Sequence, residues 1–258
     1  MIKLEVAVDD ALGLTAAVAG GADRIELCAA LEIGGLTPSA GLMAQAARCG
    51  VPVYAMIRPR SGGFFYLPAE LEVMHSDIAA ARAAGLAGVV FGALTADGVL
   101  DLPAMAGLCA ASAGMGVTLH RAFDLVPDWR AALDGAVGLG VERILTSGGS
   151  ISAPAGAARL AEVMAYAGTR ITVMPGAGIS AATIGVLADL PLTEVHASCG
   201  SAVNAGAQDL AMGFSQVGAR RTDARLVAAL KAALAKETHQ TQDHPKPTLE
   251  PSASSSIT

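Results

Sequence analysis

The sequence has few lysines and few aromatic residues. The shortage of lysine limits the classes of enzyme to which the protein can belong. Lysine occurs only at Lys3, Lys231, Lys236 and Lys246, and none of these stands at the C-terminal end of an expected strand. A Schiff-base aldolase, which needs a lysine nucleophile, is therefore a poor interpretation. The formal net charge is −6 and lysine and arginine form no cluster, which argues against a nucleic-acid-binding surface.

Long apolar runs and known catalytic motifs are missing as well. Charges or glycines interrupt every apolar run before it reaches membrane length, and the N-terminus lacks a signal-peptide pattern. The four cysteines, Cys28, Cys49, Cys109 and Cys199, are widely spaced without a Cys-x-x-Cys pair. We therefore expect a reduced, cytoplasmic protein that has no membrane segment. The chain also contains no Walker loop, Gly-x-Ser-x-Gly elbow or His-Glu-x-x-His motif.

What is present is a regular alternation of apolar strand patterns and alanine-rich helical patterns. The chain has 258 residues, of which 53% are hydrophobic but only 3% aromatic, so its core is built from small aliphatic groups. Eight segments have the composition of buried strands: Lys3–Val8, Asp23–Cys28, Val51–Ile57, Gly88–Ala93, Gly116–Arg121, Arg143–Ser147, Arg170–Met174 and Glu194–Cys199.

Strand–helix alternation predicts parallel strands joined by right-handed crossovers, and eight such units predict an α/β fold, a single-domain TIM (β/α)8 barrel. A doubly wound open sheet is the alternative; it usually has fewer strands and a glycine-rich turn after the first, where Asp9 and Asp10 stand here. We assign the barrel to residues 1–236. Residues 237–258 are polar and are expected to form a disordered tail, in which His239 and His244 are weak metal-ligand candidates.

Polar side chains gather at the C-terminal ends of the expected strands, where TIM barrels carry their chemistry. Side chains alternate along a strand, so Arg24, Glu26 and Cys28 share one face. We expect Glu26 to converge with Glu5, Arg58, His120 and His196 at one end of the barrel, and in an enzyme Glu26 and His120 would exchange protons. Structural alternatives remain: Arg24, Glu26 and Arg58 as a buried ion network, and Asp124 as the cap of a helix beginning near Pro127.

Two glycine-rich turns suggest an anion-binding pocket. They follow the sixth and seventh strands, at Ser147–Gly149 and Gly176–Gly178, and such turns present backbone N–H groups to an anion. With Arg58 and Arg60 they predict a pocket for a phosphate, sulfate or carboxylate. The full set of expected substrate or anion contacts is Arg24, Arg58, Arg60, Arg121, Asp124, Ser147, Gly148, Gly176, Gly178, His196 and Ser198.

Several blocks of the sequence resemble those of the CutC copper homeostasis proteins. The blocks are Gly21–Cys28, Gly34–Ser39, Ile57–Arg60, Val89–Gly98, His120–Asp124, Ile144–Gly148 and Gly176–Gly178, and the resemblance runs from about Leu4 to about Ser201. It implies a cytoplasmic TIM-barrel protein that forms homo-oligomers and binds copper, with Cys28 as the expected Cu(I) ligand.

The chain departs from that family pattern at two places. Ala7 stands where a cysteine is often found in the first strand, so the implied copper site keeps one thiolate, with Met56 or Cys199 as further sulfur candidates. Ser61–Phe64 lacks the aspartate usual in the loop after Arg60. Two functions therefore stand side by side: a copper-binding homeostasis protein, and an isomerase- or lyase-type enzyme acting on a phosphorylated or other anionic small molecule.

Overall fold

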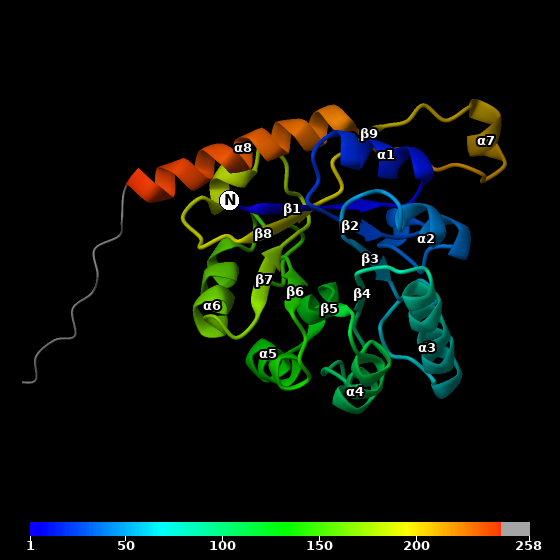
Figure 1. Ribbon diagram of the computed structural model, residues 1–258, viewed down its shortest axis with the longest axis vertical. Helices are drawn as coiled ribbons and strands as arrows, with labels where there is room; N and C mark the ends of the chain where they lie inside the picture. Colours follow the sequence, from blue (N-terminus) through cyan, green and yellow to red (C-terminus); the bar gives the residue numbers. More distant parts are fainter. Residues whose placement is uncertain (244–258) are drawn as a thin grey trace, which may run out of the picture.

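A ring of parallel strands surrounded by helices forms the body of the molecule (Figure 1). The structure is a computed structural model and describes residues 1–243. The strands of the ring are β1 (Lys3–Val8), β2 (Arg24–Leu27), β3 (Val53–Met56), β4 (Gly88–Phe91), β5 (Gly116–Leu119), β6 (Arg143–Thr146), β7 (Thr172–Pro175) and β8 (Glu194–Ala197). Each lies inside, or within a residue of, a strand expected from the sequence.

The strands follow one another around the ring in chain order. From β1 to β7 each strand pairs in parallel with the next, and β1 also pairs with β8, so that Glu5 lies opposite Arg24 on one side and His196 on the other. Strands β7 and β8 contact each other but share no ladder pairing within the described residues. The barrel is thus closed on all sides but this one, and the predicted TIM-barrel fold is confirmed.

Short polar side chains begin the outer helices. Ser39 accepts a hydrogen bond from the Leu42 N–H. In the same way Asp101 and Asp128 each accept a backbone N–H at the start of the helix that begins directly after them. The helices of the ring are α1 (Ala11–Ala19), α2 (Ala40–Ala46), α3 (Pro68–Ala83), α4 (Leu102–Ala111), α5 (Trp129–Gly138), α6 (Ala157–Ala167) and α8 (Ala224–Asp243), with 3-10 turns η1 (Leu31–Ile33), η2 (Arg121–Leu125) and η3 (Ile184–Leu187).

The last part of the chain departs from strict alternation. Only η3 joins β7 to β8, and after β8 the chain forms a projecting arm from β9 (Gly200–Ala202), α7 (Ala207–Ala211) and β10 (Arg220–Thr222) (Figure 1). Helix α8 then continues to Asp243, beyond the domain boundary expected at residue 236; His244 and the rest of the expected tail lie outside the described residues. None of the helices within 1–243 is long and apolar enough to cross a membrane.

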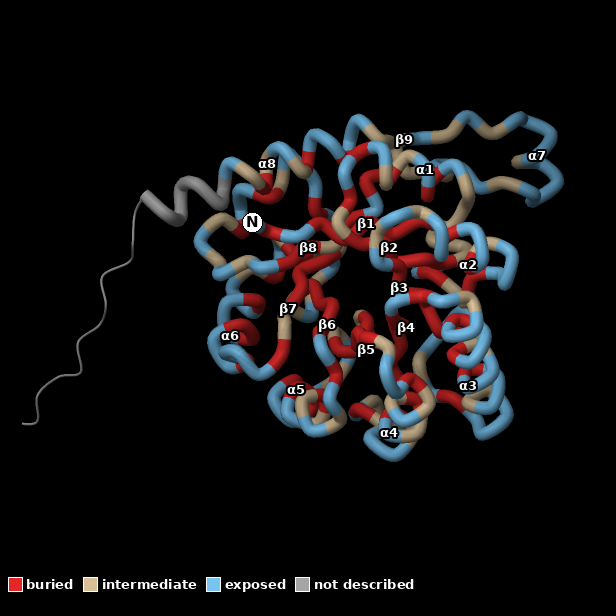
Figure 2. Tube along the Cα trace, in the orientation of Figure 1, coloured by how far each residue is buried: buried red, intermediate tan, exposed pale blue. Residues whose placement is uncertain are grey.

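The core has two chemically different parts. Apolar side chains such as Leu4, Ile25 and Leu27 fill the space between strands and helices, and Figure 2 shows the strands buried along their length. The barrel interior instead holds Tyr54, whose ring lies over Gly88 and Gly116. A Cβ atom on either glycine would come within 2.2 Å of that ring or its hydroxyl. These glycines therefore make room for a large polar aromatic in the centre.

Candidate functional site

A layer of paired charges crosses the barrel interior. The guanidinium of Arg24 is ion-paired with Glu5 and with Glu194, and Arg143 reaches the same Glu194 oxygen at 3.1 Å. All four side chains are nearly buried, and the Tyr54 ring lies beneath the two guanidinium groups at 5.3 and 4.8 Å. Two positive and two negative groups thus neutralise one another, which is the condition for burying charge.

Glu26 lies two residues beyond Arg24 and has no guanidinium partner of its own. Its Oε2 atom is 3.7 Å from Nε2 of His196 and accepts a hydrogen bond from the Cys28 thiol at 3.6 Å. His196 is held from its other side, since Nδ1 is 2.8 Å from Glu5. The second oxygen of Glu26, Oε1, is buried and makes no hydrogen bond within the described residues. A carboxylate oxygen of this kind is left to interact with a ligand.

Burial and the neighbouring charges shift the pKa of each member of this group. Burial raises the pKa of Glu26, helped by Glu5 and opposed by His196. Burial alone would lower the pKa of His196, but the charges of Glu26 and Glu5 outweigh it and the net shift is upward. Glu5 has its pKa lowered to about 2 because His196 and Arg24 outweigh the effect of burial. Glu26 and His196 thus form a pair in which both pKa values are displaced, and such pairs are typical of acid–base sites.

A cation could in principle use the same atoms. Ligand atoms of Glu5, Glu26 and His196 lie within 4.8 Å of one another, and carboxylate and imidazole ligands suit a divalent cation better than Cu(I). Arg24, however, is in direct ion pair with Glu5 and repels a cation there. Cys28, the expected Cu(I) ligand, is completely buried, and burial followed by the charge of Glu26 raises the pKa of its thiol. The thiol is therefore protonated at neutral pH.

His120 stands in a second group, built from the ends of β3, β4 and β5. Its ring packs on Phe64 with centroids 4.6 Å apart, and a Cβ on Gly92 would come within 2.8 Å of it. The Nδ1 atom accepts a hydrogen bond from the Ala122 N–H, whereas Nε2 is buried without a partner within residues 1–243. Burial, with a small contribution from Arg58, lowers the pKa of His120 to about 3.

Asp124 fills the glycine-rich turn after β6. Its carboxylate accepts hydrogen bonds from the backbone N–H groups of Ser147 and Gly149, from the hydroxyls of Thr146 and Ser147, and from Arg121. Gly148, at φ +71°, donates its N–H to Thr146. Helix α5 is capped by Asp128 instead, so Asp124 does not have the capping role considered above. The donors expected to bind an anion are here used by the protein's own carboxylate.

The two arginines after β3 are also engaged within the protein. Arg58 donates to the carbonyl oxygens of Ile33, Gly35 and Gly62, and only its Nε atom lacks a partner among the described groups. It does not join an ion network with Arg24 and Glu26. Arg60 is ion-paired with Glu70 and donates to loop carbonyls. Both side chains therefore fasten the loop that carries Phe64 over His120.

The turn after β7 lies next to His196. A Cβ on Gly176 would come within 2.4 Å of the Leu145 side chain and 3.3 Å of the Cβ of His196, so the glycine lets the turn lie against both residues. Ala177 and Gly178 follow with φ of +72° and +70°. Ala30, Ala177 and Cys199 are the non-glycine residues with positive φ in the described chain, and all three follow C-terminal strand ends. Such strain concentrates at functional sites. Ser198, between His196 and Cys199, is exposed.

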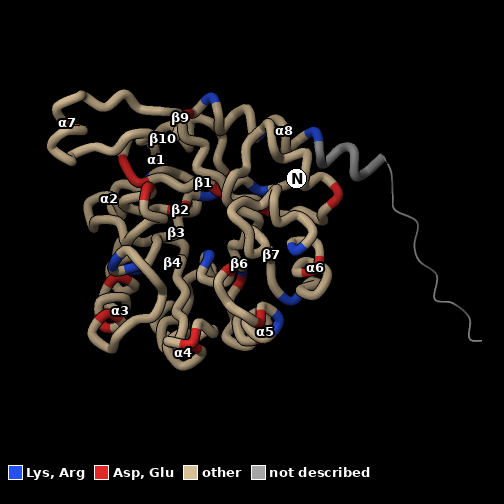
Figure 3. Tube along the Cα trace, turned by 180° about the vertical axis from the view of Figure 1, so that it is seen from behind, with Lys and Arg blue, Asp and Glu red and all other residues tan. Residues whose placement is uncertain are grey.

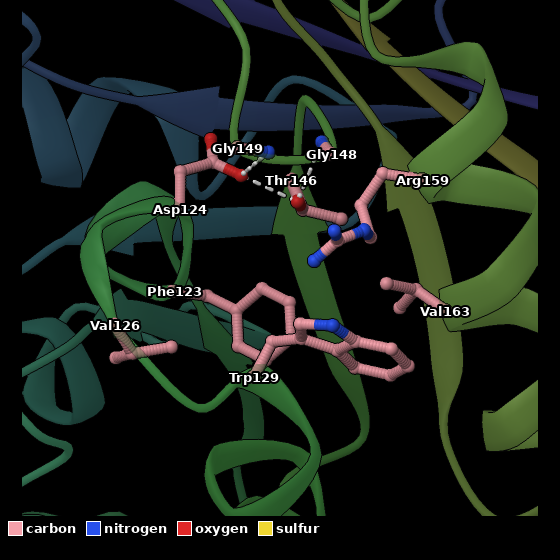
Figure 4. Close-up of a pocket in the computed structure, with 9 residues that line it drawn as sticks. All are labelled: Phe123, Asp124, Val126, Trp129, Thr146, Gly148, Gly149, Arg159 and Val163. Carbon is pink, nitrogen blue, oxygen red and sulfur yellow. Dashed lines mark hydrogen bonds between the residues drawn. The ribbon is translucent and has the colours of Figure 1, made fainter.

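A small cavity of about 50 Å³ lies outside this interior, between η2, α5 and α6. Figure 4 shows Trp129, Phe123 and Arg159 around it, with Asp124 at its edge. It holds only a few water molecules and contains none of the buried acid–base groups. We therefore place the candidate site at the C-terminal end of the barrel strands, which we call the barrel mouth. There Glu26 and His120 have polar atoms without a partner among the described residues.

Sequence reasoning missed Tyr54, Arg143 and Glu194. They lie at the beginnings of their strands or in mid-strand, whereas the chemistry of a TIM barrel is expected at the C-terminal ends. A usable signal was present: Arg143 and Glu194 are charged residues at the first positions of β6 and β8, and both are buried. In Figure 3 acidic and basic residues accordingly occur on the strands as well as on the outer helices.

Comparison with known proteins agrees with the architecture. The model of the CutC family matches residues 2–201. A family protein CutC from Rhizobium meliloti is 58% identical over 235 residues, covering 90% of this chain and 96% of its own, and one from Caulobacter vibrioides is 50% identical over 236 residues with the same coverage.

Solved structures show the same relationship. A Streptococcus agalactiae protein, provisionally named copper homeostasis protein CutC, has a TM-score of 0.73 at 32% identity and covers 77% of this chain and 99% of its own. KGPDC from Streptococcus mutans, at 14% identity, has a TM-score of 0.58, covers 92% of this chain and 98% of its own, and shares the fold alone. On the family match and these identities, the chain belongs to the CutC family.

Proposed function

We propose that this protein is an enzyme that transfers a proton to or from a small polar molecule bound at the barrel mouth, with Glu26 as the acid–base group. The observation that carries this proposal is the buried, unpaired Oε1 of Glu26. Arg24 is neutralised by Glu5 and Glu194, which leaves Glu26 to interact with His196 and a ligand. Burial also raises the pKa of Glu26, and a carboxyl group shifted in this direction is typical of acid–base catalysts.

Ligand-observed NMR with a panel of small polar metabolites tests this proposal. We expect binders whose affinity falls at least about tenfold in Glu26→Gln, which keeps the shape of the side chain but removes its charge. Arg170→Gln is the matched control, since Arg170 pairs with Asp134 on the surface. Binding that is equal in wild type and Glu26→Gln for every compound would refute the proposal.

We further propose that the ligand carries an anionic group that contacts the turn at Gly176–Gly178. Loops after the seventh and eighth strands often bind phosphate in TIM barrels, and here the turn lies beside His196. Arg58, Arg60 and the turn at Ser147–Gly149 are weaker candidates for binding the anion, because their N–H groups already donate to acceptors within the protein. Sulfate or phosphate should raise the melting temperature if this contact exists. An unchanged melting temperature at high anion concentration would contradict it.

A second candidate is the copper role suggested by the name of the Streptococcus agalactiae relative. Cys28 and Met56 pack together in one small cluster, which offers two sulfur atoms. Ala7 lies opposite Glu26 on β1, on the barrel face that Cys28 shares, so Ala7→Cys would add a thiol there. A Cu(I) competition titration should show affinity that vanishes in Cys28→Ser and rises in Ala7→Cys; equal affinity in all three proteins would exclude this site.

For the setting of this function we propose the cytoplasm and a homo-oligomeric state. All four cysteines are free thiols, as a reducing compartment requires. The arm after β8 carries exposed apolar side chains at Met212, Phe214 and Val217, which are suited to contact another subunit. Analytical ultracentrifugation would test this, since a monomer at all concentrations would exclude the assembly.

A further inference from the structure

The imidazole of His120 is buried, and the proton transfer proposed for Glu26 gives it no role. Its Nδ1 accepts the Ala122 N–H at 3.2 Å, so that nitrogen carries no proton. A neutral imidazole carries one proton, which must then be on Nε2. This N–H is buried and unpaired within the described chain. A buried donor without an acceptor carries a desolvation penalty that no contact within the described chain offsets, which points to a ligand as its partner.

His120 and Glu26 both point into the interior of the barrel, near the C-terminal ends of their strands. Arg143 contacts Thr118 of β5 at 3.1 Å and also contacts Glu194, the partner of Arg24, so Thr118 and Arg24 are linked by one network of interior side chains. Glu26 and His120 each lie two residues further along their strands, and the ladder with β4 continues to His120, whose N–H donates to Phe91. Side chains alternate along a strand, so Glu26 and His120 also point inward, nearer the C-terminal end of the barrel than Arg24 and Thr118.

The mouth therefore presents an unpaired acceptor, Glu26 Oε1, and an unpaired donor, His120 Nε2–H. We propose that the substrate is an enolisable carbonyl compound, with its carbonyl oxygen on His120 Nε2–H and the adjacent C–H directed at Glu26. This inference rests on the proposed function and deepens it. It also gives His120 a role different from the proton exchange expected from the sequence, because it acts as a fixed hydrogen-bond donor.

The step balances without any other reactant. The Glu26 carboxylate takes the proton from the carbon next to the carbonyl, the C–H electron pair forms a C=C bond, and the carbonyl π pair moves to oxygen. The resulting enolate oxygen keeps its hydrogen bond to His120, and Glu26 returns the proton to the same carbon. A neutral imidazole is suited to this because it polarises a carbonyl without giving up its proton. The pKa of about 3 keeps His120 neutral throughout.

Deuterium exchange is the direct test. The protein is incubated in D2O with α-hydroxyaldehydes, α-hydroxyketones and α-keto acids, each with and without a phosphate group, and loss of the C–H signal is followed by NMR. We expect exchange with at least one compound and none in Glu26→Gln. His120→Phe, which keeps a ring against Phe64 but removes the donor, should slow exchange on the order of 100-fold or more. His120→Gln, which retains an N–H, should keep most of the rate.

The outcomes separate this inference from the proposed function. Binding of non-carbonyl compounds that depends on Glu26, with no exchange in any carbonyl compound, overturns the inference and leaves the proposed function standing. Equal loss in His120→Gln and His120→Phe overturns the donor role. Nitrogen-15 NMR of the wild type adds a test without substrate: we expect a proton on Nε2, none on Nδ1 and no titration between pH 5 and 8. A charged His120, or one protonated on Nδ1, would refute the inference.

Discussion

Replacement of Arg24 by methionine tests whether paired burial of charge holds the barrel interior. Arg24→Met leaves Glu5, which is completely buried, and Glu194 without their shared guanidinium. The pKa of Glu5 is lowered from 4.5 to about 2. At about 1.4 kcal/mol for each pH unit, this corresponds to roughly 3 kcal/mol of stability. Breaking one partner of a buried ion pair costs about 3–5 kcal/mol, so we expect a loss of that size at pH 7.

The pH dependence of this loss has a definite sign. Because the folded-state pKa of Glu5 is depressed, its contribution is present above about pH 4.5 and is lost as the pH falls toward 2. In Arg24→Met only His196 is left to oppose burial, so the folded-state pKa of Glu5 rises above its wild-type value, and the stability difference from wild type should narrow as the pH is lowered from 5 toward 2. Urea denaturation of both proteins at each pH measures it.

Arg170→Met provides the matched control for this prediction. Arg170 pairs with Asp134 in a surface ion pair whose side chains are 43% and 47% exposed, and such pairs contribute less than about 1 kcal/mol. The buried network would be refuted as a source of stability if Arg24→Met lowered the free energy of unfolding no more than Arg170→Met does. A stability difference between wild type and Arg24→Met that stays constant with pH would refute it as well.

Three further predictions follow from particular contacts. Gly88→Ala should destabilise the protein by about 1–3 kcal/mol because its Cβ meets the Tyr54 ring at 2.2 Å, whereas Gly138→Ala, with open space around it in α5, should be neutral or stabilising in the same thermal denaturation assay. Asp124→Ala should lower the melting temperature by removing the acceptor of the β6 turn and leaving its N–H groups unpaired; an unchanged value would mean that water replaces the carboxylate. The Cys28 thiol, completely buried with a raised pKa, should resist alkylation by iodoacetamide at pH 7 until the protein is unfolded, and rapid labelling of the native protein would contradict its burial.

The strands and the barrel could be predicted from the sequence because both depend on local periodicity. The eight segments with the composition of buried strands correspond to the eight strands of the ring. The partners of the charged residues could not be predicted. Arg24 and Arg58 look alike in sequence, yet Arg24 pairs with Glu5 and Glu194 while Arg58 binds loop carbonyls, because contacts across a barrel depend on strand tilt and register.

The anion site illustrates the same limit. A glycine-rich turn predicts free N–H donors, but the sequence does not show that Asp124, after another strand, points its carboxylate into that turn. Likewise, a histidine at a strand end suggests proton transfer. Its burial and the hydrogen bond from Ala122, which make His120 a neutral donor, become visible only in three dimensions.

The most direct test of the account is a crystal structure of the protein with the strongest-binding compound of the NMR panel. We predict a ligand in the barrel mouth with one polar or reacting atom at Glu26 Oε1 and an oxygen within about 3.2 Å of His120 Nε2. A ligand bound elsewhere, for example in the cavity beside Trp129, or one in the mouth that leaves Glu26 Oε1 unpaired, would contradict it.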